Sequence, residues 1–337
     1  SEADVESTRI QVNGFVVRDD CEEPSHPLSE GTVHDYLLKN GVPGISGVDT
    51  RAITRKLRSA GVMMGIITLN ADVEIALATL AKAPRYGEFD VVGDVSTDDI
   101  YAWNGDAGEE SRAFFDLRGR ARQGGMGINV ERGIGQRDLG DNYMKVVVND
   151  YGVKLNILRS LRARGCEVIV VPDNASAEDI LGHNPDGVML SPGPGDPELL
   201  DRSVDTAKGL AGKVPMMGIC LGHQVIARAF GASTFKLHFG HRGGNQPVKD
   251  LESGRVYVTA QNHGYAVDPA GLPEAMEVSH INLNDQTVEG LRHRDMPIMT
   301  IQYHSEASPG PHDSEYLFDR FVGLIQAGQA EKAAAKV

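Results

Sequence analysis

The chain has 337 residues, of which 41% are hydrophobic and 24% charged, and its formal net charge is -14. This composition is typical of a globular protein of about two domains, and the acidic balance argues against a protein that binds nucleic acid. The sequence contains no apolar run long enough to span a bilayer and no signal-peptide pattern, so we expect no membrane partner. The three cysteines are widely spaced and odd in number, which predicts a reducing, cytoplasmic location.

The first 104 residues are expected to form a small mixed α/β domain. Its predicted elements are a strand at 10–17, helices at 32–39 and 49–60, a strand at 63–69 and a helix at 72–80. The helix at 49–60 carries several arginines on its outer face. These arginines form either a solvated face or a contact surface for a larger partner, and composition alone favours the solvated face.

Residues 105–142 differ from their surroundings, because glycines lie among arginines and aspartates with few large apolar side chains. This pattern predicts a flexible linker or a surface insertion. Gly133 and Gly135 do not complete a dinucleotide-binding fingerprint, and no predicted strand precedes them, so a nucleotide site is excluded there.

Residues 143–328 alternate between strand and helix patterns, which predicts an α/β domain with a mostly parallel open sheet and flanking helices. The predicted strands are 145–150, 166–171, 187–190, 214–219 and 297–303, and the clearest helices are 153–164 and 318–325. A Pro/Gly-rich loop, Ser191 to Pro197, ends one strand at the edge where open α/β sheets bind ligands. The last residues, 329–337, are expected to fray.

Cys220 lies in the stretch G-I-C-L-G, between an apolar strand and a helix that Gly231 closes. A nucleophile on such a strand–turn–helix elbow is exposed to substrate, and the helix N-terminus favours a thiolate. The backbone N–H of Leu221 would point at an oxyanion. A buried core cysteine is the ordinary alternative, but the glycine on each side favours the nucleophile.

His304 and Glu306 are two residues apart at the end of a predicted strand, so their side chains share one face. Glu306 would then orient His304 as the base for Cys220, although a structural histidine is the ordinary alternative. His263 is a weaker candidate because no carboxylate stands beside it. His238 and His241 lie in a Gly-rich loop and are taken as structural, and no metal motif is present.

G-I-C-L-G-H-Q followed by Q-Y-H-x-E resembles the class I, triad-type glutamine amidotransferases. V-V-V-N-D-Y-G-V-K-L-N-I-L-R, S-P-G-P-G-D-P, F-G-H-R-G-G-N-Q-P-V and Q-N-H-G-Y-A-V-D resemble, more narrowly, the glutaminase subunit of carbamoyl-phosphate synthases. H-S-E-A-S-P-G-P-H-D-S and the early segment P-G-I-S-G-V-D-T-R-A-I-T-R-K-L-R resemble it too. The similarity covers nearly the whole chain except about residues 106–142.

The resemblance implies that Cys220, His304 and Glu306 hydrolyse glutamine to glutamate and ammonia through a thioester. It implies an oxyanion site at the backbone N–H groups of Gly193 and Leu221. By the same matching, the residues that bind glutamine would be Gly195, Gln224, Asn262, Gly264 and Tyr265.

The resemblance also implies a partner, a large subunit that uses ATP and Mg to combine the ammonia with bicarbonate, for arginine and pyrimidine biosynthesis. This chain would bind no cofactor of its own. The family's small subunits usually begin with a further stretch, so Ser1 aligns inside their N-terminal domain and the sequence is expected to be a fragment or an incomplete gene model. Ser305 replaces the family's usual proline, with a modest effect expected.

Two other functions stay open from the residues alone. One is a glutaminase module of another synthetase, such as those for anthranilate or GMP, which would lack the segment at 49–60. The other is a catalytically silent regulatory subunit, which would be expected to lose the nucleophile. Both features are present in the sequence.

Overall fold

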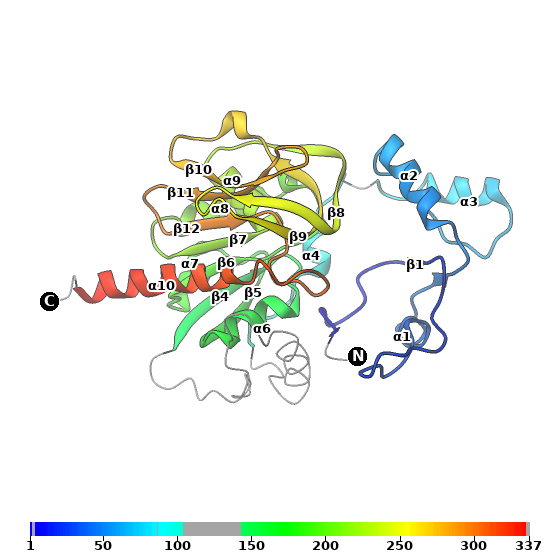
Figure 1. The fold of residues 1–337 in the computed structure, drawn as a ribbon, viewed down its shortest axis with the longest axis horizontal. Coiled ribbons are helices and arrows are strands. Elements are labelled where there is room, and N and C mark those ends of the chain that lie inside the picture. Colours follow the sequence, from blue (N-terminus) through cyan, green and yellow to red (C-terminus); the bar gives the residue numbers. More distant parts are fainter. Residues whose placement is uncertain (2–3, 86, 104–142, 335–337) are drawn as a thin grey trace. The chain divides into compact units, whose positions relative to one another are not determined.

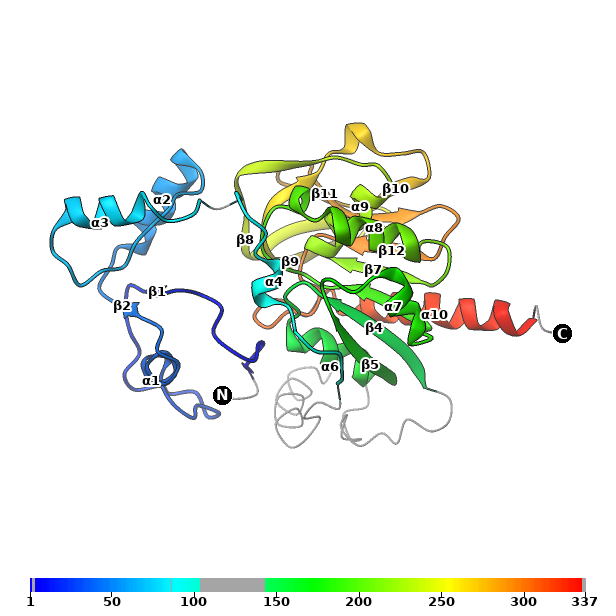
Figure 2. The same cartoon turned by 180° about the vertical axis from the view of Figure 1, so that it is seen from behind.

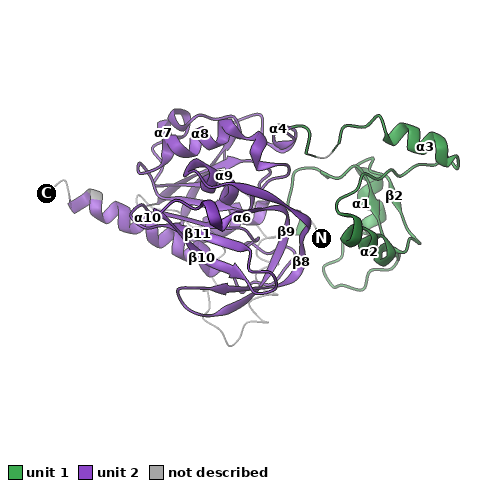
Figure 3. Ribbon diagram, turned by 90° about the horizontal axis from the view of Figure 1, so that it is seen from above, with its two compact units in different colours: residues 1–89 green, residues 90–337 purple. Residues whose placement is uncertain are grey.

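The computed structural model describes residues 1, 4–85, 87–103 and 143–334. It divides into two compact units, residues 1–89 and residues 90–337, which Figure 3 shows in different colours. The predicted insertion at 105–142 lies outside the described residues, and so do the last three residues of the predicted tail.

The described residues of the first unit form a two-stranded parallel sheet and three α-helices. Its elements are β1 (Phe15–Val16), α1 (Val33–Lys39), β2 (Gly44–Ile45), α2 (Thr50–Ala60) and α3 (Val73–Leu80). Thr32, Asp49 and Asp72 cap the three helices, because each side chain accepts a hydrogen bond from a first-turn backbone N–H. The three predicted helices are therefore confirmed, each within one residue.

The two strands predicted for this unit differ from the structure. The strand at 10–17 shortens to β1, and the prediction of a strand at 63–69 is wrong, because these residues are irregular. Met63, Met64 and Ile66 are exposed there. An apolar pattern is compatible with a strand, but a strand also needs a neighbouring strand for its backbone hydrogen bonds. The sequence pattern does not show whether that neighbour is present.

The second unit is organised around a mixed sheet (Figure 1). Among the described residues, ten strands pair in the order β3-β5-β4-β6-β7-β12-β11-β10-β8-β9. Five central strands, β5-β4-β6-β7-β12, are parallel, and the flanking strands pair antiparallel. Their bounds are β3 (Tyr101–Ala102), β4 (Met144–Asp150), β5 (Cys166–Pro172), β6 (Gly187–Leu190), β7 (Met216–Ile219), β8 (Thr234–Asp250), β9 (Val256–Val267), β10 (Met276–Asn282), β11 (Val288–His293) and β12 (Ile298–Ile301).

Helices cover both faces of the parallel part of the sheet (Figures 1 and 2). They are α4 (Val92–Val95), α6 (Leu155–Ala163), α7 (Ala177–Gly182), α8 (Asp201–Leu210), α9 (Leu221–Ala229) and α10 (Tyr316–Ala334). Val146 and Val148 of β4 pack in one core with α6 and α10, whereas Val147 packs in a second core with α7, α8 and α9. This alternation is the period of two that a strand buried on both faces requires.

Two boundaries differ from the sequence expectation. Residues 90–103 lie with the second unit rather than with the predicted 1–104 domain, because Val92 is buried there and Tyr101–Ala102 pair with β5. The helix α10 continues through Ala334, past the predicted start of fraying at 329. None of the described helices combines the length and the apolar character that a membrane crossing requires.

Candidate active site

Cys220 lies at the turn between β7 and α9, with backbone angles of φ 52° and ψ -104°. Its N–H donates to the carbonyl of Ile301 at 2.8 Å, and the N–H of Gly222 donates to Ser191 at 3.2 Å, so two neighbouring strands anchor the turn. A side chain at Gly222 would place its Cβ 2.2 Å from the carbonyl of Leu190. A non-glycine residue in this strained conformation is a feature of functional turns, as expected for a nucleophile elbow.

His304 and Glu306 follow β12 and extend its line. The N–H of His304 donates to the carbonyl of Ala260 in β9 at 2.9 Å. Nδ1 of His304 lies 2.7 Å from Oε1 of Glu306, and the Glu306 side chain is fully buried. The structure thus brings His304 and Glu306 together as predicted, and a hydrogen bond with Cys220 is among the causes that raise the pKa of His304.

The charges of this group favour the imidazolium form of His304. Burial lowers the pKa of His304, but the charge of Glu306 and the hydrogen bonds with Cys220 and Glu306 outweigh burial and raise the pKa to about 10. Burial raises the pKa of Glu306, but the charges of Lys154 and His304 outweigh it and lower the pKa to about 2. A carboxylate beside an imidazolium is the arrangement that orients and stabilises a protonated histidine during acyl transfer.

Two residues of α6 and its start support Glu306 and were missed as site residues from the sequence. Nζ of Lys154 lies 3.2 Å from Oε1 of Glu306 and donates to the carbonyl of Ala307 at 2.6 Å. Asn156 donates through Nδ2 to the backbone carbonyl of Glu306. Both belong to the motif D-Y-G-V-K-L-N, whose polar residues at the carboxyl end of β4 were the available signal.

The predicted oxyanion donors lie on two adjacent backbone segments. Leu221 is the first residue of α9, where backbone N–H groups have no acceptor within the helix. Gly193 lies in the loop after β6, and a Cβ there would stand 2.1 Å from the carbonyl of Tyr151. Gly195, in the same loop, has a φ of +99° that favours glycine. Close backbone approach is thus built into this loop.

The remaining predicted glutamine residues come from α9 and β9. Gln224 is buried, and its Nε2 donates to the carbonyl of Tyr265 and to Oε1 of Gln302, both at 2.8 Å. The amide nitrogen of Gln224 therefore links α9 to the backbone of Tyr265 and to the side chain of Gln302. Asn262 is exposed, and Tyr265 is buried with the Lys236 ammonium 6.0 Å from its ring centre.

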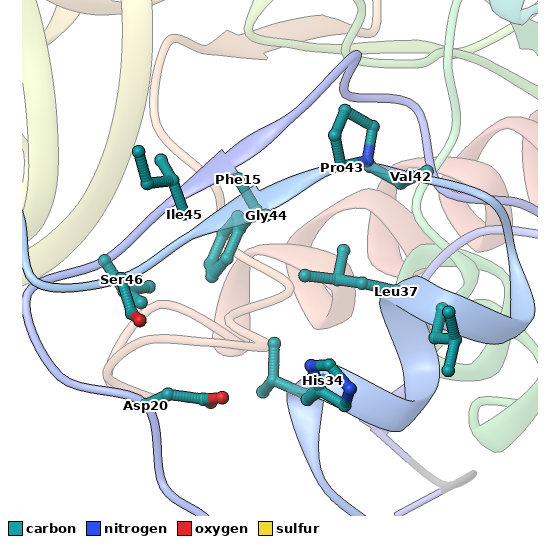
Figure 4. Close-up of a pocket in the computed structure, with 12 residues that line it drawn as sticks. Phe15, Asp20, His34, Leu37, Val42, Pro43, Gly44, Ile45 and Ser46 are labelled. Atoms are coloured by element: carbon teal, nitrogen blue, oxygen red, sulfur yellow. The ribbon is translucent and has the colours of Figure 1, made fainter. Parts of the chain in front are cut away.

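The described residues contain two further features. Side-chain atoms of His241, His263 and Glu289 lie within 4.8 Å of one another and are of the types that bind metal ions. In the first unit, a cavity of about 270 Å³ is lined mainly by apolar residues, with Asp20 and His34 as its charged or titratable members (Figure 4). Neither feature contains Cys220, His304 or Glu306.

Comparison with known families matches both parts of the chain. The model of the class-I glutamine amidotransferases matches residues 146–324. The model of the CPSase domain of the carbamoyl-phosphate synthase small chain matches residues 1–67.

Two relatives that align with most of this chain agree with these matches. The carbamoyl phosphate synthase small chain of Syntrophotalea carbinolica is 44% identical over 96% of this chain and 81% of that protein. The protein of the same name from Rhodopirellula baltica is 46% identical over 94% of this chain and 78% of that protein. A solved structure from Thermoplasma acidophilum, described as a GMP synthase subunit, is 25% identical over 57% of this chain and 98% of its own, with a TM-score of 0.48.

Proposed function

Because the chain belongs to the carbamoyl phosphate synthase small chains, we propose that Cys220, His304 and Glu306 are the residues that carry out its glutaminase reaction. The protein hydrolyses glutamine to glutamate and ammonia, and the ammonia serves the synthesis of carbamoyl phosphate. The observation that carries the residue assignment is the 2.7 Å contact between His304 Nδ1 and Glu306 Oε1, just after β12, which pairs with the strand that leads to Cys220.

In the first half of the proposed reaction, the Cys220 thiolate attacks the carboxamide carbon of glutamine. The carbonyl oxygen becomes an oxyanion, which the N–H groups of Leu221 and Gly193 stabilise. His304 then donates its proton to the leaving nitrogen as the C–N bond breaks, so ammonia departs and a glutamyl thioester remains.

In the second half, water attacks the thioester carbon and His304 accepts a proton from that water. The C–S bond breaks, glutamate leaves, and the Cys220 thiolate is restored. Glu306 keeps the histidine ring in one orientation throughout and offsets its positive charge whenever the ring is protonated. Gly195, Gln224, Asn262, Gly264 and Tyr265 are the proposed contacts for the glutamine substrate.

The family is the small subunit of a two-subunit synthase. We propose that this chain pairs with a large subunit that uses ATP and Mg, and that α2 with its arginines is part of the contact surface. The chain's own site needs neither ATP nor a metal for the steps above. The cytoplasm is the proposed compartment, on the number and spacing of the cysteines.

The test measures glutamate and ammonia formed from glutamine by this chain, alone and with a carbamoyl-phosphate synthase large subunit, ATP and bicarbonate. We expect the rate to rise on mixing and carbamoyl phosphate to form. A glutaminase rate that is the same with and without the large subunit would support the glutaminase site and contradict the proposed pairing. A lack of activity in both assays would contradict the catalytic assignment and favour a silent subunit.

A further inference from the structure

His241 is a buried side chain of β8 that lies between two carboxylates from the β10–β11 hairpin. Its Nε2 lies 2.8 Å from Oδ2 of Asp285, and its Nδ1 lies 3.4 Å from Oε1 of Glu289. Burial lowers the pKa of His241, but the two neighbouring carboxylates, Glu289 and Asp285, outweigh burial and raise it. The carboxylates therefore favour the protonated ring. Asp285 fixes the ring by a hydrogen bond at Nε2, whereas Nδ1 makes no hydrogen bond within the described residues and faces Glu289 as a charge contact.

Glu289 depends on this partner. Its side chain is fully buried, and its Oε1 accepts a hydrogen bond from Nδ2 of Asn282 at 2.9 Å. Its Oε2 has no hydrogen-bond partner among the described residues. A buried carboxylate is costly without a nearby cation, so the charge on His241 and the charge on Glu289 hold each other in place.

The ring of His241 contacts a histidine on the neighbouring strand, β9. In the β8–β9 ladder His241 faces His263, and the two rings meet edge to face with 4.8 Å between their centres. His263 stands between Asn262 and Gly264, two of the proposed glutamine contacts. Burial, followed by the charge of His241 as a smaller cause, lowers the pKa of His263 to about 3 despite its hydrogen bond to Tyr265. His263 is therefore a neutral ring.

That neutral ring holds the backbone of the substrate segment. Nδ1 of His263 lies 2.7 Å from the carbonyl oxygen of Tyr265, so Nδ1 carries the proton and donates it there. The same carbonyl accepts from Nε2 of Gln224 at 2.8 Å. Two buried donors therefore fix the peptide after Tyr265, one from its own strand and one from the helix that begins after Cys220.

We propose that His241, held between Asp285 and Glu289, is a positioning residue for glutamine that fixes the His263 ring and, through it, residues 262–265. The inference rests on the proposed function, because it takes this segment as the place where glutamine binds. The pairs that hold His241 involve neither Cys220 nor His304. Loss of His241 is therefore expected to raise KM for glutamine more than it lowers kcat.

A divalent cation is the competing explanation for the same cluster, since His241, His263 and Glu289 are close enough to share one. The hydrogen bonds favour a protonated His241, rather than a metal ion, as the positive charge in this cluster. Nδ1 of His263 donates to the carbonyl of Tyr265, so this nitrogen has no lone pair for a metal ion. Only Nε2, which lies 2.9 Å from Oε1 of Gln261, would be left as a ligand atom of His263.

The experiment uses the full chain with the large subunit, ATP and bicarbonate, and compares wild type with His241→Gln and Glu289→Gln. His293→Gln is the matched control, because His293 is 8% exposed against 7% for His241 and its ring packs on Phe230 instead. The readouts are KM and kcat for glutamine and the metal content of the purified protein. Labelling rates of Cys220 are measured with iodoacetamide and with a diazoketone analogue of glutamine.

We expect His241→Gln to raise KM roughly tenfold or more, with kcat within about threefold of wild type. Labelling by the glutamine analogue should slow with KM, whereas labelling by iodoacetamide should keep its rate. Glu289→Gln should act in the same direction, and His293→Gln should leave KM within about twofold. An unchanged KM with a lowered Tm would overturn the proposal, and so would a stoichiometric metal ion whose removal reproduces the variant.

Asp285→Asn keeps the proposal testable if the buried variants fail to fold. Asp285 is 41% exposed on its side chain, so its loss disturbs the core less while still releasing Nε2 of His241. We expect a smaller rise in KM, and an unchanged KM would count against the proposal. Failure of the proposed function is read separately, because wild type would then show no glutaminase activity before any variant is compared.

Discussion

The ammonium of Lys154 lies 3.2 Å from Oε1 of Glu306. The same carboxylate oxygen lies 2.7 Å from Nδ1 of His304. A buried acid thus has a cation on each side, one from the start of α6 and one at the end of the β12 line. Since Lys154 is the first of the causes that lower the pKa of Glu306, the lysine is expected to keep the acid ionised.

Lys154→Met should therefore narrow the pH range of glutamine hydrolysis from the acid side. Without the ammonium, the pKa of Glu306 rises, so the carboxylate that holds His304 is lost at a higher pH than in wild type. We expect the acid limb of the profile of kcat against pH to move up by roughly one pH unit. The measurement is kcat for glutamine from about pH 2 upward, so that the range includes the limb expected from the lowered pKa of Glu306.

Two further variants bracket this prediction. Lys154→Arg keeps the charge and should restore most of the acid limb. Lys145→Met removes a lysine whose pairing with Glu167 lies on β4 and β5, away from the site, and should leave the profile unchanged. An acid limb that is the same in Lys154→Met and in wild type would show that Glu306 does not need the lysine.

The His304–Glu306 pair should also give the fold a defined pH dependence. The pKa of Glu306 is lowered from 4.5 to about 2, so its stabilising contribution is present above 4.5 and is lost as pH falls through 2. The pKa of His304 is raised from 6.5 to about 10, so its contribution is complete below 6.5 and is lost as pH rises through 10. Both contributions are complete only between 4.5 and 6.5.

Thermal unfolding of wild type and the double variant His304→Gln/Glu306→Gln measures that window. The difference in Tm should be largest near about pH 5.5 and should narrow toward about pH 3 and about pH 9. A difference that stays constant over this range would contradict the pKa directions assigned to the pair.

The sequence was a good guide wherever a local pattern carries the structure. The helices at 32–39, 49–60 and 72–80 start at capping side chains, and a cap and its first turn are neighbours in the chain. The elbow at Cys220 is likewise local, because glycines beside the cysteine, a strand before it and a helix after it determine the turn. The spacing of His304 and Glu306 was enough to predict their contact.

Contacts between distant parts of the chain were beyond those patterns. Lys154 and Glu306 are brought together by the sheet order, which places α6 beside the end of the β12 line only after folding. His241 was taken as structural because it lies in a Gly-rich stretch, and its two carboxylates come from another hairpin that the local pattern does not show. The strand predicted at 63–69 is wrong for the same reason, because no local signal shows whether a partner strand is present.

Gly193→Ala tests the close backbone contact at the proposed oxyanion site. The added Cβ would lie 2.1 Å from the carbonyl of Tyr151, so the loop must shift and carry the Gly193 N–H away from the oxyanion. We expect kcat for glutamine to fall at least about a hundredfold. Gly323→Ala is the control, because the site is exposed within α10 and open around the new Cβ.

The control should keep wild-type kcat and gain about 0.5–1 kcal/mol in the free energy of unfolding, because alanine favours helix over glycine. A wild-type kcat in the Gly193→Ala protein would show that the N–H of Gly193 does not stabilise the oxyanion.

Cys220→Ser is the most direct test of the nucleophile. A serine hydroxyl has a much higher pKa than a thiol and is not activated by the same helix N-terminus and histidine, so attack on the carboxamide should nearly cease. We expect kcat for glutamine to fall at least about a thousandfold, whereas glutamine still binds. With labelled glutamine and an acid quench, wild type should carry a glutamyl group on Cys220 and the variant should carry none. Cys21→Ser, at an exposed cysteine, should behave as wild type in both assays. Hydrolysis by Cys220→Ser at the wild-type rate would mean that the thioester is not formed at Cys220, and the elbow would then be a structural turn.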